Sequence, residues 1–93
     1  MKIVINRCFG GFGLSDQASE MYCAAKNIPT DNFFDRDVPR NDPVLVEIIE
    51  KLGTAADGLY SELKVVDIPD DVDWIIEEYD GMEYVAERHR VWS

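Results

Sequence analysis

A glycine-rich segment at residues 10–13 (Gly-Gly-Phe-Gly) is the first part of the chain whose residue types could bind a ligand. It lies between an apolar run and Ser15, a residue type that favours helix starts, so it predicts a tight strand-to-helix turn. Backbone N–H groups in such a turn can hold an anion. The candidate ligand-binding residues are Arg7, Gly10, Gly11, Phe12, Gly13 and Ser15, together with Arg88 and Arg90 near the end of the chain.

This glycine segment departs from the known nucleotide-binding motifs. Asp16 stands where a dinucleotide motif has its third glycine, and an acid at that place repels phosphate. The Gly-Lys-Ser/Thr sequence of triphosphate-binding loops is absent. The alternative is a turn without a ligand, in which Phe9 and Phe12 pack over the core.

An acidic stretch is the second candidate site. Residues 65–93 hold nine acids and two bases, a net charge of −7, whereas residues 1–64 hold ten acids and seven bases, a net charge of −3. The pattern does not fit a calcium loop, because Ile75 and Ile76 occupy positions that need an acid and a glycine. Either this is ordinary solvated surface or it docks onto a basic protein surface. The candidate partner-binding residues are Asp70, Asp71, Asp73, Trp74, Glu77, Glu78, Tyr79 and Trp92.

Catalytic chemistry has little support in the residue types. His89 is the only histidine, so a catalytic triad would have to unite it with a distant nucleophile such as Cys8. Cys8 and Cys23 have neither zinc-site nor redox-pair spacing, and we expect two free thiols. We therefore expect a protein that is not an enzyme and that has no metal or other cofactor.

Length and charge narrow the class further. The 93 residues suffice for one domain, and 46% hydrophobic content is normal for a folded one. The net charge of −10 argues against direct binding of duplex nucleic acid, which needs basic surface. No apolar run is long enough for a membrane span or a signal peptide, so we expect a cytoplasmic protein without a membrane contact.

The elements that must position these residues follow from periodicity and turn residues. We expect strands at residues 2–8 and 59–68, helices at 15–26 and 42–52, and a hairpin of strands 73–79 and 82–88 around Asp80-Gly81. The alternative for residues 70–80 is a helix, because the spacing of Val72, Ile75, Ile76 and Tyr79 also fits a helical stripe. Residues 28–41 have no regular pattern. The prediction is a single α+β domain over residues 1–93, with an antiparallel or mixed sheet of three to five strands, two short helices and a C-terminal β-hairpin.

Both ends of the chain carry recognisable sequences. The opening MKIVINRCFGGFGLS, the IPDDVDW and EEYDG segments from residue 68 to 81, and RHRVW at residues 88–92 resemble a family of small hypothetical proteins of bacteriophages and prophages. The resemblance implies a phage accessory protein acting in the cytoplasm of a bacterial host. It implies no catalytic residues.

Three functions are compatible with these observations. The leading hypothesis is a phage binding protein that engages or inhibits a host defence or nucleic-acid-handling protein through its acidic surface. The first alternative is a protein that sequesters a small anionic ligand such as a nucleotide in the glycine-rich turn. The second is a structural phage protein without a separate activity. A homodimer is compatible with each of them.

Overall fold

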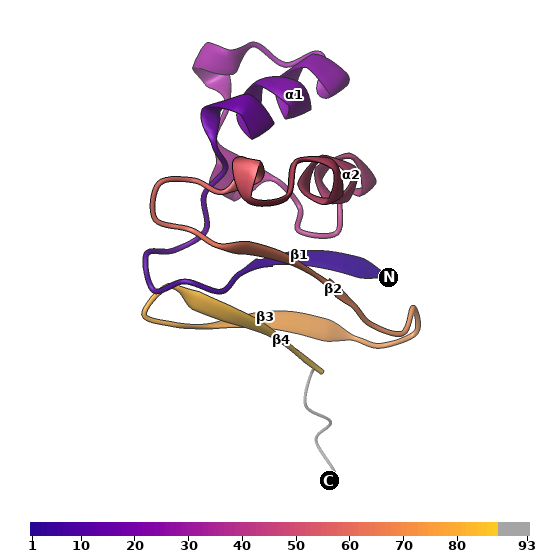
Figure 1. Ribbon diagram of the computed structural model, residues 1–93. Helices are drawn as coiled ribbons and strands as arrows, with labels where there is room; N and C mark the ends of the chain where they lie inside the picture. Colours follow the sequence, from indigo (N-terminus) through magenta and orange to yellow (C-terminus); the bar gives the residue numbers. More distant parts are fainter. Residues whose placement is uncertain (88–93) are drawn as a thin grey trace, which may run out of the picture.

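A computed structural model describes residues 1–87, which form two helices and four strands (Figure 1). The elements are β1 (Lys2–Asn6), α1 (Asp16–Lys26), α2 (Pro43–Leu52), β2 (Leu63–Asp67), β3 (Trp74–Tyr79) and β4 (Met82–Glu87). Three short 3-10 turns lie at Thr30–Asn32, Asp35–Asp37 and Gly53–Ala56. The predicted α+β class, the two short helices and the C-terminal hairpin are confirmed.

The four strands form two separate antiparallel pairs, β1–β2 and β3–β4, and not the single sheet that we expected. The second edge of β1 meets no strand among the described residues. Its Val4 N–H donates to the Arg40 carbonyl at 2.8 Å, and its Asn6 N–H donates to the Glu83 carboxylate at 2.9 Å. A loop and a side chain thus take up the hydrogen bonds that would have joined the two pairs.

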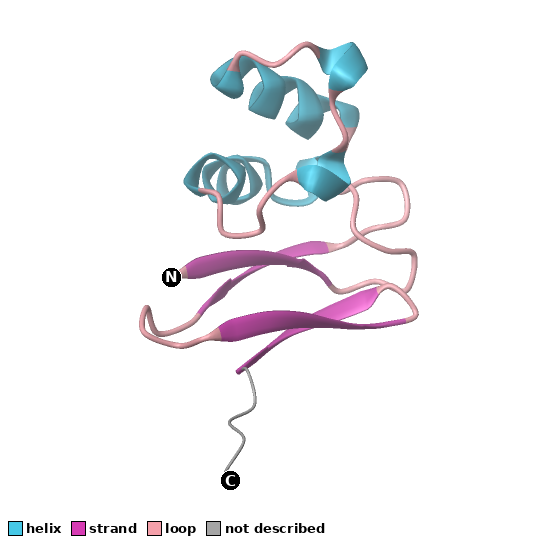
Figure 2. Ribbon diagram, turned by 180° about the vertical axis from the view of Figure 1, so that it is seen from behind, coloured by secondary structure: helices cyan, strands magenta, loops and turns pink. Residues whose placement is uncertain are grey.

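The molecule has three layers (Figures 1 and 2). The helices cover one face of the β1–β2 pair, and the β3–β4 hairpin lies on its other face. Ile3, Val4 and Ile5 in β1 are each no more than 3% exposed. Since side chains alternate along a strand, Val4 points to the helices while Ile3 and Ile5 point to the hairpin layer. Burial on both faces makes β1 the centre of the fold.

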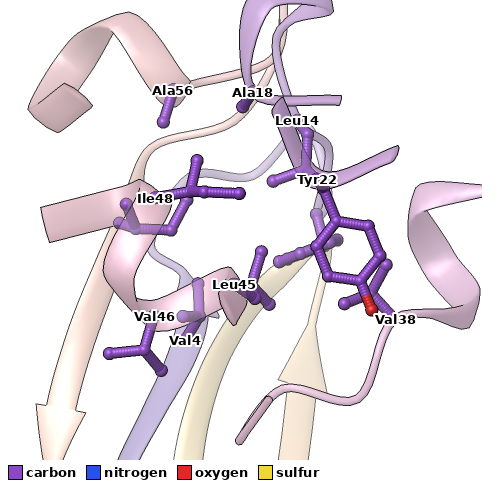
Figure 3. Packing of buried hydrophobic residues seen from close by; sticks show 11 residues of the cluster. Val4, Leu14, Ala18, Tyr22, Val38, Leu45, Val46, Ile48 and Ala56 are labelled. Carbon is purple, nitrogen blue, oxygen red and sulfur yellow. The ribbon is translucent and has the colours of Figure 1, made fainter. Parts of the chain in front are cut away.

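The core on the helical side is built from short aliphatic and aromatic side chains (Figure 3). Val4 lies beneath α2, and the α1 side chains approach α2 from the opposite side. The buried cluster comprises Val4, Phe12, Leu14, Ala18, Tyr22, Val38, Leu45, Val46, Ile48, Ile49 and Ala56. The four buried residues of α2, which are Leu45, Val46, Ile48 and Ile49, therefore face this core.

Local sequence signals determine where the helices begin and how the hairpin turns. Ser15 caps α1 by accepting from the Ala18 N–H, and Asp42 caps α2 by accepting from the Val44 N–H. Asp80 and Gly81 have φ angles of 50° and 89°, as the tight two-residue hairpin turn requires.

The irregular segment between the helices is attached to the core by one of its two adjacent aromatics. Phe33 is half-buried, with its ring centroid 5.5 Å from that of Tyr22. Phe34 is 69% exposed. The segment is thus a loop held to the core through Phe33, and neither aromatic belongs to a strand.

Candidate binding surface

Three loops meet at the end of the molecule opposite the N-terminus (Figure 1). They are residues 7–13 after β1, residues 57–62 before β2, and the β3–β4 turn. Asn6, the last residue of β1, is fully buried between them. A buried amide is costly unless all of its hydrogen bonds are made, so its partners are informative.

The Asn6 side chain bonds to all three loops. Its Nδ2 donates to the Cys8 carbonyl at 2.6 Å and to the Gly81 carbonyl at 2.7 Å. Its Oδ1 accepts from the Glu62 N–H at 2.9 Å and from the Cys8 N–H at 3.3 Å. Both amide protons and both lone pairs of the oxygen are therefore used, and one side chain holds three loops in a fixed arrangement.

Two glycines allow these loops to touch. A Cβ placed on Gly10 would lie 2.3 Å from the Tyr60 Cβ, and one placed on Gly81 would lie 2.3 Å from the Phe9 carbonyl oxygen. Such contacts are far below van der Waals distance, so only glycine allows the backbones to approach this closely. The loop after β1 is thus packed against both of the others.

Large apolar side chains are exposed on two of these loops and on the last residue of β3, which adjoins the third loop. Phe9 is 63% exposed, Leu59 89%, Tyr60 69% and Tyr79 71%. The expectation that Phe9 packs over the core is wrong, whereas Phe12 is buried as expected. Isolated exposed apolar residues are ordinary, but four on adjoining loops are typical of an interaction surface.

Sequence reasoning missed Leu59 and Tyr60 because the run from residue 59 to 68 resembled one strand. The strand begins only at Leu63. A signal for a turn was present: Asp57-Gly58 precedes the pair and Ser61 follows it, and these residue types favour turns. Ser61 does close this loop, since its N–H donates to the Gly58 carbonyl at 3.2 Å and its Oγ accepts from the Gly58 N–H at 2.7 Å.

A buried ion pair lies beneath the loops. Glu83 is 5% exposed. Its carboxylate accepts hydrogen bonds from both terminal nitrogens of Arg40, and the distance from Nη2 to Oε2 is 2.8 Å. The Arg40 guanidinium also lies 3.6 Å from the centroid of the Phe12 ring. The pair joins the hairpin to the irregular segment, and neither residue was among the predicted site residues.

The glycine-rich turn already holds a carboxylate of the protein itself. The Leu14 N–H donates to the Asp35 carboxylate at 3.0 Å. The Gly13 carbonyl accepts from Gly58, and the Ser15 hydroxyl donates to the Ala55 carbonyl. This turn therefore uses several of its polar groups internally.

Two of the other predicted ligand-binding residues, Gly11 and Phe12, line a small cleft. Arg7 is exposed and donates to the Glu83 carbonyl at 3.0 Å. Gly11 and Phe12 line a cleft of about 180 Å³ together with Arg36, Arg40, Glu78 and Glu83. Sites for drug-sized ligands are larger, from about 300 Å³, and two carboxylates offset the two guanidinium groups. Arg88 and Arg90 lie outside the described residues.

The predicted acidic partner-binding residues divide between two ends of the hairpin. Asp70, Asp71 and Asp73 belong to the connection that precedes β3, whereas Glu77 and Glu78 lie near the turn at its other end. The strand between these groups is six residues long, which corresponds to roughly 20 Å. Asp70 also pairs with the Met1 amino group at 2.5 Å, and this contact lowers the pKa of its carboxyl.

The residues of β3 also divide between its two faces. Glu78 pairs across the hairpin with the buried Glu83, so it lies on the inner face. Glu77 pairs with Tyr84 on the outer face and accepts from its hydroxyl at 2.6 Å, which raises the pKa of Tyr84. Trp74 is half-buried and Tyr79 is exposed. Trp92 lies outside the described residues.

The structure bears on a metal site and on the state of the two cysteines in residues 1–87. These residues contain no group of three or more His, Cys, Asp or Glu arranged to hold a metal ion. Cys8 is half-buried and Cys23 buried, both as free thiols.

Over residues 1–87 neither helix has the length and apolar content needed to cross a membrane. The Cys8–His89 pairing considered above involves a residue outside the described range.

No family model, curated protein or solved structure matches this chain. The resemblance to small phage proteins therefore stays a prediction.

Proposed function

We propose that the protein is a non-enzymatic binding protein that docks onto the basic surface of another protein. The sequence resemblance makes a phage origin, and a host defence or nucleic-acid-handling protein as the partner, part of this proposal. On this proposal the acidic C-terminal part of the chain carries the charge that the partner recognises.

One observation supports the proposal above the others. From Asp67 to Glu87 the chain has nine carboxylates and no lysine or arginine, and eight of the nine are on exposed residues. Glu83 alone is buried, where it pairs with Arg40. The acidity of the sequence is therefore largely acidity of the surface, carried by the end of β2, the connection to β3 and the hairpin itself.

Such a surface favours a partner of opposite charge in two ways. It accelerates the encounter with a basic protein, and it repels nucleic acid and acidic proteins. Because the carboxylates are exposed, their contribution is screened by salt. Binding should therefore weaken as ionic strength rises.

The test is affinity capture from a bacterial lysate with the whole chain and two variants. The first variant neutralises five residues of the acidic layer, by which we mean the β3–β4 hairpin and the connection that precedes it: Asp70→Asn, Asp71→Asn, Asp73→Asn, Glu77→Gln and Glu78→Gln. The matched control neutralises five exposed acids of the helical layer: Glu20→Gln, Asp31→Asn, Asp37→Asn, Glu47→Gln and Glu50→Gln.

We expect the unaltered protein and the control to retain the same basic protein, and the first variant to lose it. Raising the salt concentration should release the retained protein from both the unaltered chain and the control. Equal retention by the two variants, or no specifically retained protein at all, would contradict the proposed function.

A further inference from the structure

We propose that the loop end, defined by the exposed side chains of Phe9, Leu59, Tyr60 and Tyr79, is a recognition site for a peptide segment that carries an aromatic or aliphatic side chain beside arginine or lysine. This inference rests on the proposed function for the charge of the partner. It adds the place of contact and the requirement for an apolar anchor.

The first argument is that the surface is held ready for binding. Asn6 bonds to all three loops, and Gly10 and Gly81 allow their backbones to pack together. A preorganised site loses little conformational entropy when it binds. Flexible loops with the same exposed residues would lose more.

The second argument is the kind of side chain displayed. Tyrosine and phenylalanine provide large contact areas with few rotatable bonds, and interface hot spots are rich in aromatic residues. Leu59 is 89% exposed, so folding buries almost none of its apolar surface. Its apolar surface is stabilised only when something covers it.

The third argument is charge, which selects the occupant. The exposed acids Glu62, Glu78 and Asp80 lie on these loops or beside them. Arg7 is the only Lys or Arg in residues 7–13, 57–62 and 78–82, and its guanidinium already donates to the Glu83 carbonyl. An apolar centre with an acidic rim is complementary to an apolar side chain flanked by basic ones.

The test is a selection of random short peptides displayed against the whole chain, after which every selected peptide is also tested for binding to the variant Leu59→Ser/Tyr60→Ser. The matched control is Phe34→Ser, because Phe34 is 69% exposed like Tyr60 but lies in the helical layer. Dissociation constants of the selected peptides are then measured by fluorescence anisotropy at low and high salt. Circular dichroism and urea unfolding verify that each variant is folded.

We expect the selected peptides to be enriched in arginine or lysine together with aromatic or aliphatic residues. They should bind the unaltered chain and the Phe34→Ser variant equally, and bind the double variant about tenfold more weakly or worse. Peptides without an excess of basic residues would overturn the inference. So would peptides that bind the double variant as tightly as the unaltered chain.

The five-residue variant of the acidic layer distinguishes this inference from the proposed function. Peptides that lose affinity for that variant but not for Leu59→Ser/Tyr60→Ser would support an acidic docking surface and refute the loop end as its centre. Peptides that lose affinity only for the double variant would support the loop end and refute the acidic layer as the source of binding. Loss for neither variant would refute both proposals.

Discussion

Two buried polar side chains, Asn6 and Glu83, determine how the end of this molecule is built. Each makes side-chain hydrogen bonds that join separate segments of the chain. The Asn6 amide makes four such bonds, and the Glu83 carboxylate accepts from the Asn6 N–H as well as from Arg40. Their partners are distant in the sequence, so neither role follows from local pattern. In the sequence Asn6 merely interrupts an apolar run, and Glu83 is one acid among nine.

The buried pair makes a strong prediction for the substitution Glu83→Gln. Removing the carboxylate leaves the Arg40 guanidinium, whose side chain is 17% exposed, without its counter-charge. Breaking a buried pair in this way costs about 3–5 kcal/mol in the free energy of unfolding. The control is Glu87→Gln on the same strand, where the acid is exposed and the expected change is within about 0.5 kcal/mol. Urea unfolding measures both, and equal effects would mean that the pair contributes little.

At the scale of elements, predictability followed the strength of the local signals. Ser15, the Asp42-Pro43 pair and Asp80-Gly81 act within a few residues of themselves, and the elements that they start or join were predicted within a few residues of the observed ends. Residues 28–41 were not predictable because their order comes from contacts with other parts of the fold. Asp35 accepts from Leu14, for example, across 21 positions.

The candidate site was less predictable than the elements that carry it. Sequence reasoning identified the glycine-rich segment and Tyr79, which do lie at the loop end. It could not identify Asn6 as the residue that joins the loops, because one of the hydrogen-bond partners of its side chain is 75 positions away. It also assigned the partner-binding acids to a single surface, although the length of β3 separates them.

The junction between the helices predicts a pH dependence of stability. Asp42 caps α2, accepts from the Tyr22 hydroxyl at 2.8 Å and pairs with Lys26 at 3.2 Å. Burial opposes ionisation of Asp42, but its hydrogen-bond donors outweigh burial and lower the pKa of the carboxyl below its ordinary value. A lowered pKa in the folded state means that the ionised group stabilises the protein above the unfolded-state pKa. That stabilisation is lost as pH falls through the folded-state pKa.

We therefore expect Asp42→Asn, which keeps the capping ability, to cost about 1–2 kcal/mol near neutral pH. The difference in free energy of unfolding between the unaltered protein and this variant should shrink as pH falls below about 4. Chemical unfolding over a pH series measures it. A difference that is constant down to strongly acidic pH would show that the charge of Asp42 is not what stabilises the junction.

At the scale of the whole molecule, the central position of β1 makes the three layers depend on one another. A two-stranded hairpin is marginal in water by itself, so β3–β4 needs the apolar face that Ile3 and Ile5 offer. The helical layer in turn needs the hairpin, because without it these two side chains would be exposed and Arg40 would lose Glu83. This mutual dependence also explains how a small acidic chain can carry so much charge on its hairpin layer: the hairpin is held by its inner face, and its outer face is left to solvent.

The layers should consequently unfold together. Trp74 reports on the hairpin in a Trp92→Phe background, and far-UV circular dichroism reports mainly on the helices. We expect the two signals to follow one urea transition, because a domain of this size without independent cores unfolds in one cooperative step. In Glu83→Gln the common midpoint should fall without splitting, since Ile3 and Ile5 still bind the layers together. If the Trp74 signal changed at a lower urea concentration than the circular dichroism of the unaltered protein, the hairpin would be an independent unit. The loops that depend on its turn would then lack the preorganisation that the proposed recognition site requires.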